Sequence, residues 1–185
     1  MKKDLIISWD VGIKTLSYAI SVIDENKHLI VKVVKMIDLS QGDESINLEP
    51  RSLTNWNIHG WETRLEKYLQ KWSFQIFHPT IKLCLIEDQP SRDFIRLQNV
   101  IMKEFQARNI KTLLVHPGRK YKDEDIGKYS YAARKELSVI YCSIILNKDA
   151  KKNRYAISKI NQISRDLRPN PADAILICAG FHKLI

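Results

Sequence analysis

Three acidic residues occupy positions from which carboxylates can cooperate in catalysis. Asp10 ends the apolar run LIISW, and Glu87 ends a second apolar run, IKLCLI. An acid at the end of an apolar strand costs free energy on partial burial unless a cation lies beside it. Asp173 falls in the first turn of the last expected helix. Clustered carboxylates bind Mg²⁺ through hard oxygens, and two such ions about 3.5 to 4 Å apart activate water for attack on a phosphodiester.

Each of these acids also has a purely structural interpretation. Asp10 stands just before Gly12, a pattern that can simply mark a turn. Asn170, Pro171 and Asp173 make a good helix start. Asn is a favoured N-cap, Pro suits the first helical position, and an acid is stabilised near the positive end of the helix dipole. Spacing alone leaves the metal cluster and the structural interpretation both open.

The elements that must position these acids begin with strands. Short apolar runs rich in β-branched residues and bounded by turn signals predict five of them. Short connections join the first three, which is typical of an antiparallel meander. The predicted strands cover residues 5–12, 16–23, 28–37, 80–88 and 111–117.

Helices alternate with the last two strands. Apolar residues at helical spacing predict them, and Ser91 is the expected cap of the second. The expected helices cover 59–72, 91–105, 130–146 and a last one from about Asn170, with a partly helical basic segment over 148–168 and a polar loop over 38–57. The order βββαβαβαα predicts one α/β domain over 1–185, with a mixed five-stranded sheet flanked by helices in the ribonuclease H-like arrangement.

The charge of the chain indicates a polyanionic partner. Lys and Arg number 30 against 21 Asp and Glu, a net charge of +9, and most of the excess lies between Lys111 and Arg168. A solubilising surface is the alternative interpretation. The residues expected to contact phosphates are Arg119, Lys120, Lys122 and Arg134, with a second cluster of Lys148, Lys151, Lys152 and Arg154.

Composition also argues against several classes of protein. The three cysteines, Cys84, Cys142 and Cys178, are widely spaced in apolar segments, so we expect reduced thiols in an intracellular, reducing compartment rather than a zinc site or disulfides. No apolar run reaches the roughly 18 to 20 residues of a membrane span, and we expect no membrane partner. An actin-like phosphotransferase, whose related fold also opens with Asp-x-Gly, is disfavoured because the chain is too short for two lobes and lacks further Gly-rich phosphate loops. We expect no small-molecule cofactor.

Five short segments, taken together and in order, carry a resemblance to a known family. They are DVGIK from Asp10, IEDQP ending at Pro90, VHP ending at Pro117, SYAARKELSV from Ser130, and PADA from Pro171. The series resembles the Holliday-junction resolvases of poxviruses and related large DNA viruses, which are similar to bacterial RuvC. The resemblance implies a ribonuclease H-like homodimer that nicks four-way DNA junctions symmetrically with Mg²⁺, for which Mn²⁺ can substitute, in the host cytoplasm.

The resemblance also assigns roles to single residues. Asp10 and Glu87 match the family's acids on the first and fourth strands, and Asp173 matches the second of two C-terminal acids. Lys135 matches a basic residue that the family places near the scissile phosphate. Asn170 stands where the first C-terminal acid is expected. The implied metal ligands are therefore Asp10, Glu87, Asn170 and Asp173, with Lys135 as a further catalytic residue.

An asparagine at position 170 leaves three explanations open. Its amide oxygen can ligate a metal but brings no charge, so this chain can use three carboxylates and one carboxamide. Asp166, about one helical turn upstream, can substitute. The third explanation is that Asn replaces an original Asp and disables the site. A non-catalytic junction-binding module, and a ribonuclease H-like nuclease acting on RNA–DNA hybrids or flaps, are the alternative functions.

Overall fold

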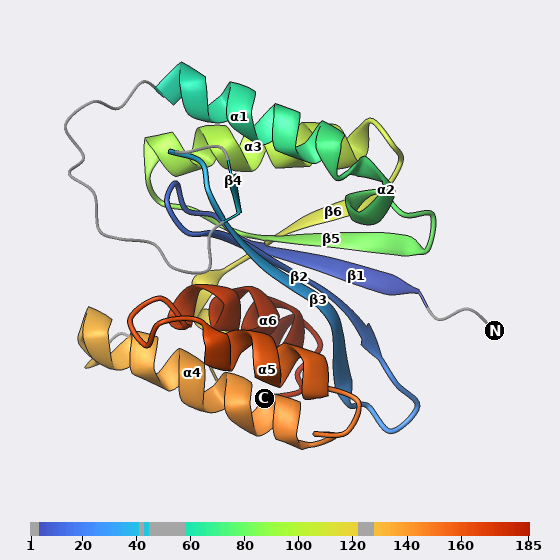
Figure 1. Cartoon of the computed structure of the whole chain (residues 1–185), viewed down its shortest axis with the longest axis vertical. Helices are drawn as coiled ribbons and strands as arrows, with labels where there is room; N and C mark the ends of the chain where they lie inside the picture. Colours follow the sequence, from blue (N-terminus) through green and yellow to red (C-terminus); the bar gives the residue numbers. More distant parts are fainter. Residues whose placement is uncertain (1–3, 41–42, 45–57, 122–127) are drawn as a thin grey trace.

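The computed structural model of the chain describes residues 4–40, 43–44, 58–121 and 128–185 (Figure 1). Most of the loop expected over 38–57 lies outside these ranges, and so does Lys122. No helix within the described ranges is long and apolar enough to cross a membrane.

A mixed sheet forms the centre of the fold, with strand order β4-β3-β2-β1-β5-β6. The first three strands make the predicted antiparallel meander, while β5 and β6 run parallel to β1. All five predicted strands are confirmed, and a two-residue strand, β4, extends the edge beside β3. The strands are β1 (Leu5–Asp10), β2 (Leu16–Ile23), β3 (Leu29–Asp38), β4 (Asp43–Glu44), β5 (Ile81–Glu87) and β6 (Lys111–Val115).

The parallel pairing decides where the functional residues lie. Trp9 pairs with Ile86, and Glu87 pairs with Val115. Because β1, β5 and β6 run in one direction, their carboxyl ends meet at the same edge of the sheet. Asp10, Glu87 and the turn that follows Val115 are therefore neighbours, although more than 70 residues of sequence separate the first two.

Helices cover both faces of this sheet (Figure 1). On one face lie α1 (Ile58–Lys71), α2 (Ser73–Ile76) and α3 (Arg92–Gln106), and on the other lie α4 (Tyr131–Asn147), α5 (Arg154–Gln162) and α6 (Pro169–Phe181). Strand β1 is buried on both faces, which explains why it reads as a continuous apolar run rather than an alternating one.

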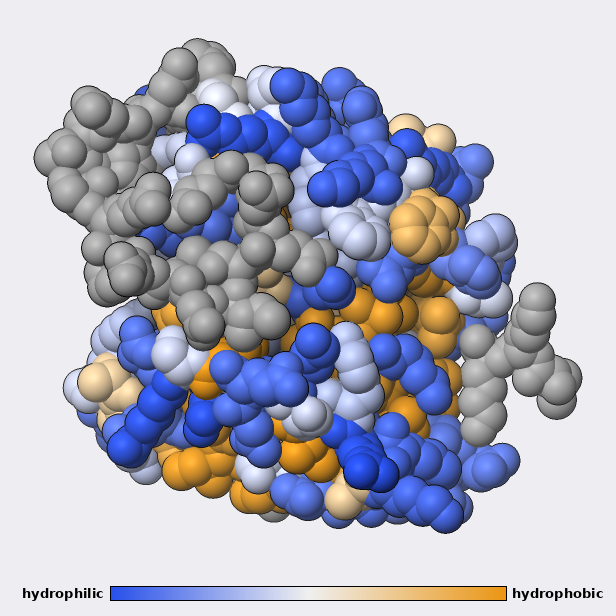
Figure 2. All heavy atoms as spheres, viewed as in Figure 1, coloured by the Kyte–Doolittle hydropathy of each residue, from blue (hydrophilic) through white to orange (hydrophobic). Residues whose placement is uncertain are grey.

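Two hydrophobic cores result, one on each side of the sheet. Trp9, Leu65 and Phe105 belong to the core under α1 and α3, while Leu85 and Ile175 belong to the core under α4, α5 and α6. The three cysteines are buried free thiols. Helix α4 also exposes Ile140 and Ile144, each 52% accessible, and Figure 2 shows apolar atoms at the surface of this helical layer.

The last helix begins two residues earlier than its N-cap signal suggests. Asn170 was expected as the N-cap, but α6 starts at Pro169 and Arg168 precedes it in helical conformation. The Arg168 side chain donates to the carbonyl oxygens of Ile163 and Asn161. These bonds fold the preceding turn onto the end of α5, so the helical geometry is already established before Asn170.

Asn153 joins the C-terminal helices to the sheet. Its fully buried side chain accepts from the Val31 backbone N–H at 2.9 Å. It also donates to the carbonyl oxygens of Leu29, at 2.9 Å, and Leu146, at 3.0 Å. The register of β2 and β3 shifts beside Val31, so Asn153 satisfies backbone groups of β3 at this irregularity.

We expect Asn153→Ala to lower the free energy of unfolding by about 2–4 kcal/mol, because three buried backbone groups lose their partner. Urea denaturation followed by circular dichroism measures the change. Asn147→Ala is the matched control, since among the described residues the Asn147 side chain bonds only to Ser143, within an exposed part of α4. We expect this variant to stay within about 0.5 kcal/mol of wild type. Equal stability of the two variants would contradict this role for Asn153.

Candidate functional site

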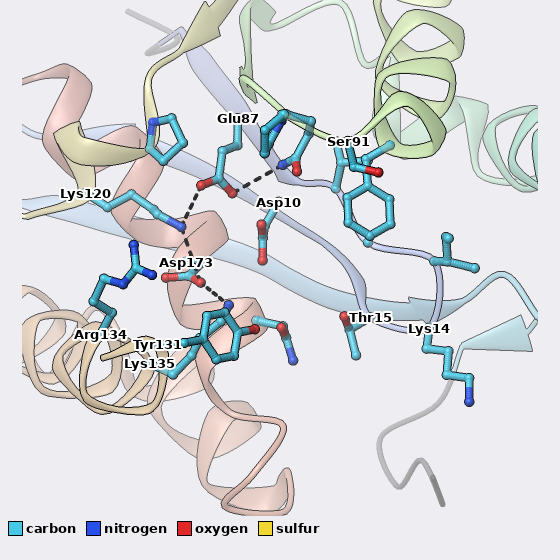
Figure 3. A pocket seen from close by; sticks show the side chains of 18 of the residues that line it. Asp10, Lys14, Thr15, Glu87, Ser91, Lys120, Tyr131, Arg134, Lys135 and Asp173 are labelled. Carbon is cyan, nitrogen blue, oxygen red and sulfur yellow. Dashed lines mark hydrogen bonds and ion pairs between the residues drawn. The ribbon is translucent and has the colours of Figure 1, made fainter. Parts of the chain in front are cut away.

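Three carboxylates converge at the carboxyl edge of the sheet. Asp10 comes from the end of β1, Glu87 from the end of β5, and Asp173 from the second turn of α6. All three are buried, with accessibilities of 8%, 6% and 0%. They face a common space (Figure 3) at the bottom of a cleft of about 860 Å³ that Asn170 also lines. All four of these residues are candidates from the sequence.

Two lysines enter the cluster from different elements. The Lys120 ammonium lies 2.8 Å from Glu87 Oε1 and 3.3 Å from Asp173 Oδ2. Lys135, on the second turn of α4, places its ammonium 2.6 Å from the same Asp173 oxygen. Figure 3 shows the Lys120 ammonium between Glu87 and Asp173, and the Lys135 ammonium beside Asp173. Charge-assisted bonds of this length in a buried site are strong and directional.

The lysines compensate the three acids unequally. Burial raises the pKa of Asp10 well above its ordinary value, and the adjacent Glu87 carboxyl raises it further. Burial also acts to raise the pKa of Asp173, but Lys120 and Lys135 outweigh it and hold that pKa below its ordinary value. Asp10 is thus the carboxyl whose surroundings disfavour charge, and a cation beside it would restore its ionised form.

The oxygen atoms present suit a hard divalent cation. Asp173 Oδ1 is buried and has no partner at ordinary hydrogen-bond distance among the described residues, although the Ser138 side chain also helps to lower the Asp173 pKa. A buried carboxylate oxygen without a donor is costly, and coordination of a metal ion removes that cost. Asn170 donates its amide nitrogen to the Leu167 carbonyl oxygen at 3.1 Å, so the amide oxygen is the atom left to act as a ligand.

A short turn places Lys120. The 3₁₀ turn η1 (Pro117–Lys120) follows β6, and His116 Nδ1 at its start accepts from the Gly118 N–H at 3.1 Å. On the other side the turn packs directly on α6. A Cβ atom built on Gly180 would lie 1.7 Å from the Arg119 carbonyl oxygen. Only glycine therefore permits this approach, and the approach fixes the backbone that carries Lys120.

The residues expected to contact phosphates separate into two groups. Arg134 lines the cleft, and Arg119 is exposed on η1 beside it. Lys120 was interpreted as a surface contact, but the structure places it in the acidic cluster, with 5% of its surface accessible. The reason is the close packing of η1 on α6, which turns the side chain inward.

The second basic cluster lies at the opposite end of α4 from the cleft (Figure 1). It comprises Lys148, Lys151, Lys152 and Arg154. Helix α4 has 17 residues, which is about 25 Å at the usual rise per residue. Lys148 donates to the Leu184 carbonyl oxygen at 2.6 Å, and Lys152 is held by two acids. The structure does not bring this cluster to the acidic site.

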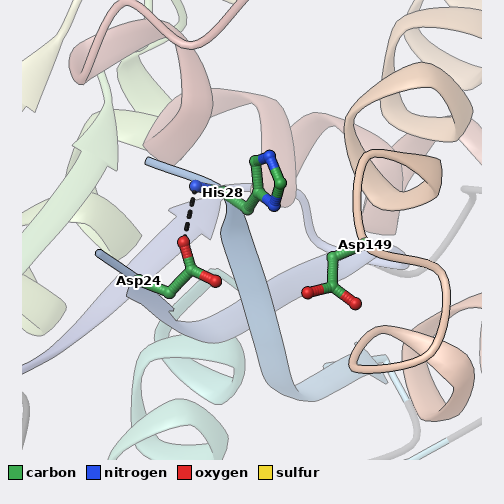
Figure 4. Close-up of side chains that lie close together, drawn as sticks. All are labelled: Asp24, His28 and Asp149. Carbon is green, nitrogen blue, oxygen red and sulfur yellow. Dashed lines mark hydrogen bonds between the residues drawn. The ribbon is translucent and has the colours of Figure 1, made fainter. Parts of the chain in front are cut away.

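Those two acids belong to a group that sequence reasoning did not find. Asp24, His28 and Asp149 lie together where the β2–β3 turn meets the end of α4 (Figure 4). The Lys152 ammonium already binds the two carboxylates, at 2.8 Å and 2.9 Å. Lys152, followed by the His28 backbone N–H, lowers the pKa of Asp24 to about 2. We interpret this group as an ion-pair link between the turn and the helix.

Two contacts of the acidic site were also missed. Besides Lys120, Gln89 places its amide nitrogen 3.5 Å from Glu87 Oε2. The sequence held a signal for the place of the turn that carries Lys120, but not for the inward direction of its side chain. If the strand over 111–117 runs parallel to the strand before Glu87, the turn that follows it must lie at the same edge of the sheet.

No family model and no curated sequence matches the chain, but solved structures do. The fowlpox virus Holliday junction resolvase superposes with a TM-score of 0.61 at 17% identity, over 98% of this chain and 99% of that one. The yeast mitochondrial Holliday junction resolvase superposes with a TM-score of 0.58 at 16% identity, over 97% of this chain and 79% of that one. Thermus thermophilus RuvC superposes with a TM-score of 0.58 at 10% identity, over 97% of this chain and 96% of that one.

These similarities define the fold. The chain has the RuvC-like, ribonuclease H-like architecture that these resolvases share. The resemblance drawn from five short sequence segments is therefore confirmed at the level of the fold.

We expect Gly180→Ala to lower the free energy of unfolding by about 1–3 kcal/mol, because the added methyl group collides with the η1 backbone. Gly60→Ala is the control within a helix. A Cβ there meets no atom within 4 Å, so the better helix propensity of Ala should leave stability unchanged or raise it by up to about 1 kcal/mol. Thermal and urea unfolding of both variants test this. A Gly180→Ala protein as stable as Gly60→Ala would contradict the tight approach.

Proposed function

We propose that this protein is a metal-dependent endonuclease that resolves four-way DNA junctions by paired, symmetric nicks. The observation that carries the proposal is the convergence of Asp10, Glu87 and Asp173 with two lysines in one cleft. The fold supports it, since two of the similar structures are resolvases solved with Holliday junction DNA.

The ligands of the metal would be carboxylate oxygens of Asp10, Glu87 and Asp173, with the amide oxygen of Asn170. Hard oxygen donors of this kind favour Mg²⁺, and Mn²⁺ can substitute. A bound divalent ion lowers the pKa of a water molecule and stabilises negative charge on a phosphodiester. Asp166 does not suit the role of substitute ligand, because it is exposed and lines a different hollow, beside Arg165 and Arg168.

The residues of the chain would hold and orient the phosphate. Lys135 stands near the start of α4, where Ser130 caps the helix by accepting from the Ala133 N–H. Its side chain is 23% accessible and lines the cleft, so it can both hold Asp173 and donate to a phosphate oxygen as charge develops. Arg134 lines the same cleft and adds positive charge for the phosphate backbone.

The wider DNA contacts and the oligomeric state belong to the same proposal. Arg119 continues the positive edge of the cleft, and Lys148, Lys151, Lys152 and Arg154 would meet a DNA arm that runs along α4. Symmetric nicking of a four-way junction requires two sites, so we propose a homodimer with one site in each protomer. We also propose a reducing compartment, which suits three free thiols.

We expect Asp10→Asn, Glu87→Gln and Asp173→Asn each to lower the rate of junction nicking by roughly 10²-fold or more, because each removes charge that holds the metal and the developing transition state. End-labelled four-way, flap and RNA–DNA hybrid substrates of equal length measure the rate in Mg²⁺ and Mn²⁺. Lys67→Met, an exposed position on α1, is the control and should keep the wild-type rate. Preferential cleavage of hybrids or flaps would favour the alternative nuclease.

We expect Asn170→Asp to lower the Mg²⁺ concentration for half-maximal nicking by roughly tenfold, because it adds a charge beside the ligands. The experiment compares the wild type and this variant on a mobile four-way junction across a Mg²⁺ titration. Cleavage by the Asn170→Asp variant alone would mean that the asparagine disables this chain. Tight binding by both proteins without cleavage would instead support a non-catalytic junction-binding module.

A further inference from the structure

Lys120 occupies a position in the acidic cluster that resembles that of a bridging cation. Its ammonium binds one oxygen of Glu87 and one of Asp173, at 2.8 and 3.3 Å. Those two oxygens therefore already share one positive charge, the Lys120 ammonium, which lies between β5 and α6. An ion that bridged Glu87 and Asp173 through the same atoms would have to take the place of the ammonium group.

The position of Lys120 is built into the fold. Only 7% of the side chain is accessible, and its backbone lies in η1, which packs on α6 without room for a Cβ at Gly180. The other side of η1 is held by the bond from Gly118 to His116. Lys120 is therefore a buried lysine whose backbone is held on two sides. It is not an exposed, mobile side chain that happens to reach the site.

The carboxylate that the two lysines leave without an ion pair is Asp10. It faces the same space as Glu87 and Asp173 (Figure 3), and among the described residues no ion pair joins it to Lys120 or Lys135. The cluster thus contains one cation position filled by a lysine and one with oxygen donors to spare.

The net charge of the cluster also favours one lysine and one divalent ion over two divalent ions. Three carboxylates with the ammonium groups of Lys120 and Lys135 carry one net negative charge when all are ionised. One divalent ion turns this into one positive charge, which matches a single phosphodiester. A second divalent ion would leave two further positive charges in a largely buried cluster, which is costly at short distances in a medium of low dielectric constant.

We propose that Lys120 is a built-in cation of this site and replaces one of two divalent ions, so that each chain binds a single ion beside Asp10 and Asp173. This inference rests on the proposed metal site and deepens it, because it assigns the second positive charge of the site to the protein itself. Lys120 is then a fixed electrostatic group that also keeps Glu87 and Asp173 in place before the ion binds.

The test is metal binding without DNA, so that its result does not depend on nicking. Mn²⁺ is titrated into the full chain at neutral pH and ionic strength near 0.15 M, and free Mn²⁺ is counted by electron paramagnetic resonance. We expect one Mn²⁺ per chain in the wild type, in Lys120→Arg, which keeps the charge, and in Lys67→Met, the surface control. We expect two in Lys120→Met, with the first ion bound roughly tenfold more tightly.

Three results would overturn the inference. The first is two Mn²⁺ per wild-type chain, which needs no variant and therefore holds even if Lys120→Met does not fold. The second is a folded Lys120→Met protein with the stoichiometry and affinity of the wild type. The third is two ions in Lys120→Arg. By contrast, no Mn²⁺ bound to any of the proteins would refute the metal site itself, and metal binding as expected without junction nicking would refute only the proposed activity.

Discussion

The structure depends on how three buried carboxylates are compensated at one edge of a sheet. Parallel pairing of β1 with β5 brings Asp10 and Glu87 together, and α6 adds Asp173 from the layer below. Uncompensated, such a cluster would protonate or separate, since burial of charge without a partner is expensive. Lys120 and Lys135 supply two of the charges that prevent this, and the elements that carry them are packed to deliver them to that point.

The two helical layers have unequal parts in this arrangement. The α1 and α3 side closes a large aromatic and aliphatic core and fixes the sheet. The α4, α5 and α6 side has its own core and also contributes Asp173, Lys135 and, through the contact at Gly180, the position of Lys120. Asn153 holds this second layer to β3 by side-chain bonds to the backbone. Stability of the α4–α6 layer and geometry of the site are therefore linked.

The sequence was sufficient to predict the strands, the layered fold and the acids, because each depends on local pattern. An acid that ends an apolar strand, as Asp10 and Glu87 do, is visible without a structure. The role of Lys120 could not be predicted from the sequence, because a lysine in a basic, glycine-containing turn is usually exposed. Its burial follows from a tertiary contact at Gly180, 60 residues later. The start of α6 was displaced for a similar reason, since the bonds of Arg168 to α5 are not encoded in local helix signals.

Asn170 and Lys120 are best understood through the same charge balance. An aspartate at position 170 would leave the metal-free cluster with two net negative charges instead of one, and a second divalent ion would then be easier to accommodate. The neutral amide keeps the cluster close to what the two lysines can balance and retains an oxygen for coordination. A site with one fixed ammonium in place of an ion therefore has less need of the fourth carboxylate. On this argument, the departure at Asn170 and the burial of Lys120 are two parts of one electrostatic solution.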